Sequence, residues 1–248
     1  MKKLLIFSSI GDDHNKYKQW KQKDKEKADI GEHDCDFTLV LVYRGSDISR
    51  REEIKNHCDI FFELPSNKWE ALLLLEQQLE YDYIFMLDED ICISFSDICK
   101  MFKYVTNNNI KASAPAYSIR GQIPHGNHVM LASKFDMNGK SFTAYAKYLD
   151  SGALLLQRGA EMTAFLKLFN KHKHMIHEKA VGYLIAAAYA TEAEPLILLY
   201  FITVLKPLPI ATGDSNKYIA VRDDVIEYKT WEHNYISYAK EHSLPHPL

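Results

Sequence analysis

Three consecutive carboxylates follow an apolar run in the segment YDYIFMLDEDICIS, residues 81–94. Residues 83–87 have the composition of a buried strand, and Asp88, Glu89 and Asp90 come directly after it. In an extended segment, residues two apart project from the same side, so Asp88 and Asp90 are expected to face one cation while Glu89 points elsewhere. Such oxygen ligands suit Mn2+ or Mg2+, which bind through one or two carboxylates together with substrate phosphates. The motif, a DXD, therefore predicts a metal–diphosphate site with Asp88 and Asp90 as the metal ligands.

Acidic strand ends are also common on solvated surfaces, so the choice between a metal site and a solvated strand end depends on the surrounding helices and strands. Asn67 is expected to cap a helix, with Glu70 completing a capping box three residues later. Apolar runs and turn residues predict strands over 4–9, 36–45, 58–65, 83–90, 110–118 and 152–158, a strand pair within 195–205, and helices over 66–82, 94–109, 160–172 and 180–190.

Strands that alternate with helices predict an α/β fold with a mostly parallel central sheet flanked by helices. No repeat or linker divides the chain, so we expect a single domain over 1–248, with a nucleotide-binding half (1–110) and an acceptor-binding half (111–248). Ligands of open α/β sheets bind beyond the carboxyl ends of the strands, where Asp88 and Asp90 fall. The charged stretch 16–34 is expected to be a solvated helix or a mobile segment; a lysine-rich contact with an acceptor or a membrane is the alternative.

The composition limits the class of protein. The chain has 248 residues and a formal net charge of −3, which argues against a nucleic-acid partner. Its four cysteines show no C-x-x-C spacing, as expected for reduced thiols. The apolar start runs into Gly11 without a cleavage site, and the apolar run after Pro195 is too short to span a bilayer. We therefore expect a cytoplasmic protein without a transmembrane segment, for which peripheral membrane contact stays open.

The carboxylate segment resembles the YDYIF-x-x-DED segment of a glycosyltransferase-like family whose plant members are labelled lysine-ketoglutarate reductase trans-splicing related. Weaker similarity follows in chain order over most of residues 3–213, in the segments CDFTLVLVYRG, NKWEALLLL, NIKASAPAYS and KYLDSGALLLQR. The segment YLDSGALLL is also similar to YFNSGVLL of glycogenin-like enzymes of the GT-A type. The resemblance implies a GT-A, Rossmann-like fold and a nucleotide-sugar donor.

Two family features are replaced in this chain. Leu184 or Ile185 stands where the family has the acid of WGLD, and Leu205 or Lys206 stands where it has a late histidine. In many GT-A enzymes a C-terminal histidine completes the metal shell. If this chain has such a ligand, His233 and His242 are candidates; otherwise carboxylate, diphosphate and water hold the metal.

The catalytic base is expected among the acids of the second half. Asp150 precedes a strand and is a candidate general base for the acceptor hydroxyl, although an aspartate before Ser-Gly also commonly caps a turn. Glu178 is the second candidate, and Glu192 and Glu194 are read as surface charges. Donor contacts are expected at the end of the first strand and near the helix start, from Ser9, Gly11, Asp12, Lys68, Asp88 and Glu89.

Two histidine-containing segments are weaker candidates. The HKHMIH segment (His172, His174 and His177) is read as a solvated helix end, because residues two apart on a helix do not share a face. The loop with Arg120, His125 and His128 is read either as a contact to acceptor or phosphate or as an ordinary exposed loop.

The sequence thus favours a metal-dependent glycosyltransferase that moves a sugar from a nucleotide-sugar donor to a glycan or another hydroxyl acceptor. A metal-dependent nucleotidyl or phosphoryl transferase uses the same carboxylates and is the first alternative. The second is a catalytically silent, glycan-binding relative, which the two replaced family residues favour.

Overall fold

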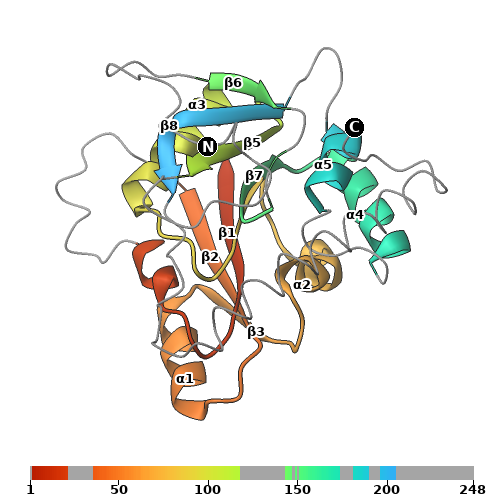
Figure 1. Ribbon diagram of the computed structural model, residues 1–248. Helices are drawn as coiled ribbons and strands as arrows, with labels where there is room; N and C mark the ends of the chain where they lie inside the picture. The colour runs from red at the N-terminus through yellow and green to blue at the C-terminus, as the bar shows by residue number, and fades with distance from the viewer. Residues whose placement is uncertain are drawn as a thin grey trace, which may run out of the picture.

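The computed structural model describes residues 2–21, 36–117, 143–146, 149, 151–173, 181–189 and 196–204. Eight strands of these residues form one sheet (Figure 1). Its order across the sheet is β3 (Ile60–Glu63), β2 (Asp36–Tyr43), β1 (Lys3–Ile10), β4 (Tyr83–Leu87), β7 (Ala153–Gln157), β5 (Ala112–Tyr117), β8 (Leu196–Val204) and β6 (Thr143–Ala146).

Parallel pairing dominates the first half of the sheet. Strands β3, β2, β1 and β4 are parallel neighbours, as are β5 and β8. Strand β7 is antiparallel to both β4 and β5, and β6 is antiparallel to β8. Four pairings are therefore parallel and three antiparallel among the described residues. This confirms the expected α/β domain with a mostly parallel sheet.

The helices are α1 (Ile48–His57), α2 (Lys68–Leu75), α3 (Phe95–Asn107), α4 (Ala160–His172) and α5 (Val181–Tyr189), with short 3-10 turns η1 (Lys16–Gln19) and η3 (Glu76–Gln78). The start of α2 shows the expected N-cap at Asn67. The side chain of Asn67 accepts hydrogen bonds from the backbone N–H groups of Trp69 and Glu70, both at 3.0 Å. Asn109, just after α3, has a φ of 51°, a left-handed conformation that asparagine tolerates well. Helices α4 and α5 pack against each other, as Figure 1 shows.

Burial explains why the central strands carry near-continuous apolar runs. Residues 4–10 of β1 and all residues of β4 are buried. Parallel strands covered on both faces require such sequences. Because β1 is in register with β2 up to Ile10 and Tyr43, and with β4 at Phe7 and Met86, the carboxyl ends of all three strands meet at one edge.

The structure differs from the sequence-based expectations at several places: strand β6 was not predicted, and β4 ends at Leu87 and not at residue 90. Helix α1 was not predicted, since Ile54 is its one buried residue and it shows no apolar periodicity. Residues 196–204 form one strand, β8, and not a strand pair. The described part of the charged stretch includes η1, whose Tyr17, together with the adjoining Trp20, is fully buried. His172 is 2% exposed, so this member of the histidine segment is not solvated.

Among the described residues, no helix combines the length and the apolar character needed to cross a membrane.

Candidate active site

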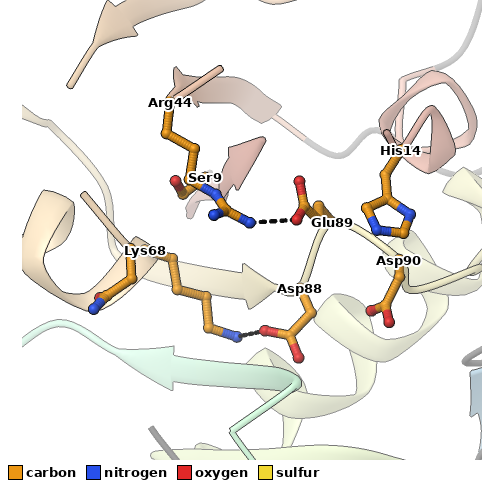
Figure 2. Close-up of a pocket in the computed structure, with 8 residues that line it drawn as sticks. Ser9, His14, Arg44, Lys68, Asp88, Glu89 and Asp90 are labelled. Carbon is orange, nitrogen blue, oxygen red and sulfur yellow. Dashed lines mark hydrogen bonds and ion pairs between the residues drawn. The ribbon is translucent and has the colours of Figure 1, made fainter. Parts of the chain in front are cut away.

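A pocket of about 250 Å³ opens at the carboxyl ends of β1, β2 and β4 (Figure 2). This is the edge at which open α/β sheets bind ligands. Three carboxylates and two cationic side chains lie in it, together with three uncharged polar residues. The lining residues are Ser9, His14, Arg44, Asn67, Lys68, Asp88, Glu89 and Asp90.

Asp88 is held by the helix that precedes its strand. Lys68, in the first turn of α2, is 5% exposed, and its ammonium donates to Asp88 Oδ1 and to the carbonyl oxygen of Ser151 at 2.5 Å. The backbone N–H of Asp88 donates to the carbonyl oxygen of Gly152 at 2.7 Å. Asp88 is therefore oriented from two sides. A buried ammonium that donates to both a carboxylate and a carbonyl is well compensated.

Glu89 spans the pocket toward the first strand. Its carboxylate accepts a hydrogen bond from the backbone N–H of Gly11 at 2.5 Å and pairs with the guanidinium of Arg44. Figure 2 shows Glu89 directed at Arg44 and Asp88 directed at Lys68. Glu89 was expected to point elsewhere than Asp88 and Asp90, but it lines the same pocket as both of them.

The three carboxylates lie on a turn and not on an extended segment. The N–H of Ile91 donates to the carbonyl oxygen of Asp88 at 3.1 Å, which closes the turn immediately after β4. Asp88 and Asp90 were expected on one side of an extended segment, and this expectation was wrong because residues 88–90 are not extended. Both residues nevertheless line the pocket. Within the described part of the chain, no group of three or more histidine, cysteine, aspartate or glutamate side chains is arranged to hold a metal ion.

A buried tryptophan, Trp20, forms a hydrogen bond with the residue that closes the turn. The indole N–H of Trp20 donates to the carbonyl oxygen of Ile91 at 3.2 Å, and both residues are fully buried. The segment after β1 therefore fixes the position of the carboxylate turn.

Asp12 has a different position from the one expected of a donor contact. Its carboxylate accepts from the Tyr43 hydroxyl and from the backbone N–H of Ser46 at 3.0 Å, so it folds the loop between β2 and α1. These bonds, the one from Tyr43 first, lower the pKa of Asp12. Burial, followed by the contact with Asp12, raises the pKa of Tyr43 to about 12. Asp12 is not among the residues that line the pocket.

Ser9 and Gly11 lie at the end of β1, as expected from the sequence. Ser9 lines the pocket, and its hydroxyl donates to the carbonyl oxygen of Ser66 at 2.7 Å. Gly11 contributes its backbone N–H, and a Cβ at this position would meet Glu89 Oε2 at 3.4 Å, an ordinary contact. Glycine is therefore not required at Gly11 for steric reasons.

Three lining residues had no place among the sequence-based site candidates: His14, Arg44 and Asn67. Arg44 directly follows β2, so the rule that named Asp88 after β4 also applies to it. His14 lies beyond the end of β1, where nothing in the spacing distinguished it from a surface residue.

Several predicted residues lie outside the described residues. They are Asp150, Glu178, Glu192 and Glu194, the histidines His125, His128, His174, His177, His233 and His242, and Arg120. The two residues after Asp150 are described, and their carbonyl groups accept the hydrogen bonds from Lys68 and Asp88.

Comparison with solved structures finds the same fold in Staphylococcus aureus TarS. A crystal structure of TarS residues 1–349 has a TM-score of 0.51 at 14% identity, covering 84% of this chain and 60% of that one. A structure of TarS 1–349 in complex with UDP-GlcNAc has a TM-score of 0.51 at 11% identity, covering 84% and 59%. A structure of TarS has a TM-score of 0.50 at 12% identity, covering 80% and 35%. At these identities the similarity establishes the fold alone.

This chain spans 60% or less of the length of those TarS chains. No protein-family model matches the sequence, and no curated protein matches it. The fold is thus that of a protein crystallised with a nucleotide sugar, while the resemblance to the plant family has no support from these comparisons.

Proposed function

We propose that this chain is a nucleotide-sugar glycosyltransferase of GT-A architecture that works with Mn2+ or Mg2+. The observation that carries the proposal is the pocket itself, in which Asp88, Glu89 and Asp90 meet Lys68 and Arg44 at the ligand-binding edge of the sheet. The fold it shares with TarS, which binds UDP-GlcNAc, supports the same donor class.

The donor set fits a hard divalent cation. Asp88 and Asp90 bring carboxylate oxygens into one pocket, and such sites are completed by phosphate oxygens and water. When bound, the metal would neutralise charge on the departing nucleoside diphosphate.

The protein's own cations have complementary roles. An ammonium has three N–H donors, and the contacts of Lys68 with Asp88 and Ser151 use two of them. Lys68 Nζ also lies 5.3 Å from the centroid of the Trp69 ring, and we propose that its third N–H donates to a phosphoryl oxygen of the bound donor. Ser9 and Gly11, at the end of β1, are proposed contacts to the nucleotide-sugar donor.

Asp150 is the proposed general base for the acceptor hydroxyl, with Glu178 as the second candidate. Ser151 and Gly152 contact Lys68 and Asp88, which brings the chain next to Asp150 to the rim of the proposed donor site. A glycan or another hydroxyl compound is the proposed acceptor.

The test is calorimetric titration of UDP-GlcNAc, with and without Mn2+, into the wild type and Asp90→Asn. We expect Mn2+-dependent binding by the wild type and an affinity loss of about 10-fold or more in the variant, since a ligand oxygen loses its charge. Asp36→Asn is the matched control, because Asp36 is exposed at the opposite end of β2. Thermal unfolding should show that both variants remain folded.

Two outcomes would contradict the proposal. Equal Mn2+-dependent binding by Asp90→Asn and the wild type would remove Asp90 from the site. Turnover of a nucleotide substrate with release of pyrophosphate, and not of a nucleoside diphosphate, would point instead to a nucleotidyl transferase.

A further inference from the structure

The partners of Glu89 have the composition of an anion-binding site. The backbone N–H of Gly11 and the guanidinium of Arg44 converge on its two carboxylate oxygens, Oε2 and Oε1. A backbone N–H together with an arginine is a common donor set for carboxylates and phosphates in proteins. Here the bound anion is a side chain of the same chain.

The backbones of Gly11 and Arg44, the two donor residues, are positioned by contacts that do not involve Glu89. Gly11 follows directly on β1, and the N–H of Arg44 donates to the carbonyl oxygen of Ile10 at 3.0 Å, which ties the end of β2 to that of β1. The loop after Arg44 is folded onto the Asp12 carboxylate. The Gly11 N–H and the backbone of Arg44 would therefore keep their places if the Glu89 side chain turned away, and the Arg44 guanidinium would lose the partner that it has in this structure.

Glu89 comes from a separate element, the turn after β4. Its carboxylate is 15% exposed, whereas Arg44 is 45% exposed and reachable from solvent. The terminal phosphoryl group of a nucleoside diphosphate or of pyrophosphate carries more charge than a carboxylate and offers three oxygens, so it competes well for a guanidinium.

We propose that Gly11 N–H and Arg44 form a phosphate subsite that Glu89 occupies in this structure, and that a phosphoryl group of the ligand displaces the Glu89 carboxylate. This rests on the proposed function for the identity of the ligand, a nucleoside diphosphate, but not for the presence of the subsite. Glu89 acts as an internal competitor: the apparent affinity is reduced by the fraction of molecules in which the subsite is blocked.

The experiment is a double-mutant cycle on Glu89 and Arg44, with inorganic pyrophosphate as the probe in buffer without divalent cation. Glu89→Gln keeps the shape of the side chain and removes its charge, and should bind pyrophosphate about 10-fold more tightly than the wild type. Arg44→Met should bind it more weakly than the wild type. Adding Glu89→Gln to Arg44→Met should give no gain, because the gain comes from releasing Arg44.

Glu63→Gln is the matched control for charge. Glu63 is exposed, pairs with Arg51 at 3.6 Å and does not line the pocket, so its neutralisation should leave pyrophosphate binding unchanged. An equal gain in Glu63→Gln, or a gain that persists without Arg44, would mean that net charge alone is responsible and would overturn the proposal. Weaker or undetectable pyrophosphate binding by Glu89→Gln would overturn it as well.

Failure of the proposed function would look different. If no nucleotide sugar binds with Mn2+ while Glu89→Gln still gains pyrophosphate affinity through Arg44, the phosphate subsite stands and the donor assignment falls. If nucleotide sugars bind but the cycle shows no coupling, the donor assignment stands and the role of Glu89 as competitor falls.

Discussion

Two of the three carboxylates in the pocket have different cationic partners: Asp88 pairs with Lys68 and Glu89 pairs with Arg44. The ammonium of Lys68 fixes Asp88, and the guanidinium of Arg44 together with the Gly11 N–H fixes Glu89. Removing one partner of such a pair leaves the other charge uncompensated, which costs more than an exposed pair is worth. The Lys68–Asp88 pair therefore sets the orientation of Asp88 before any ligand arrives, which lowers the cost of binding at that carboxylate, whereas the Glu89–Arg44 pair has to open for the ligand.

The Tyr43–Asp12 contact gives the β2–α1 loop a pH-dependent stability. The lowered pKa of Asp12 means that its contribution is present above its unfolded pKa, near 3.8, and is lost as pH falls through the folded value. The raised pKa of Tyr43 means that its contribution is full below pH 10 and is lost as pH rises toward about 12.

Tyr43→Phe should therefore be less stable than the wild type at pH 8, with a urea midpoint lower by about 0.3 M. The difference should shrink at pH 3 and again at pH 11, where one partner of the contact titrates. Urea unfolding at the three pH values measures it. A difference that stays constant over this range would show that the hydroxyl contributes through packing and not through its bond to Asp12.

At the scale of the elements, the loop between β2 and α1 depends on a glycine. A Cβ at Gly45 would lie 2.1 Å from Asp12 Oδ1 and 2.7 Å from the Tyr43 hydroxyl, so a side chain fits only if the Asp12–Tyr43 contact that folds the loop is displaced. We expect Gly45→Ala to destabilise the protein by about 1–3 kcal/mol and to weaken pyrophosphate binding, because Arg44 shifts with the loop.

Gly11→Ala is the control for that substitution. Its Cβ would meet its nearest neighbour at 3.4 Å, so its free energy of unfolding should change far less. Denaturant unfolding of both variants gives the comparison. Equal losses at the two positions would mean that backbone entropy, and not the clash with Asp12, determines the effect.

The sequence predicted the elements whose residues carry local signals. Strands β1, β2 and β4 have continuous apolar runs, and α2 begins at the Asn67 cap. Helix α1 lacks an apolar face, and the antiparallel direction of β7 depends on the path of the chain between distant elements. Neither can be read from local pattern.

The candidate site was predictable to the same degree. Asp88 and Asp90 follow a recognisable strand, and Lys68 was named as a donor contact near a helix start. The pairing of these carboxylates with their cationic partners could not be predicted from the sequence. The Glu89–Arg44 contact, for example, joins residues 45 positions apart and depends on the strand order. Asp12 was assigned to the donor from its position after the first strand alone. In the structure its carboxylate is held by hydrogen bonds from Tyr43, Ser46 and Asp47, which lie at or after the end of β2.

At the scale of the whole molecule, the described lining of the pocket comes from the first half of the chain. Its lining residues lie between Ser9 and Asp90, and the described contacts from the second half come from Ser151 and Gly152. The division into a nucleotide-binding half (1–110) and an acceptor-binding half (111–248) stays a prediction.

Hydrogen exchange on the full chain tests that division. With Mn2+ present throughout, saturating UDP-GlcNAc should slow amide exchange at 9–14, 44–47, 66–70 and 88–92, because the ligand stabilises the segments that it contacts. Helix α4, which contributes no pocket residue, should exchange at its original rate and serves as the internal reference. Equal protection of α4 and the pocket segments would mean that the donor stabilises the molecule globally. Protection confined to residues after 110 would place the donor in the other half, and the proposed division would then be reversed.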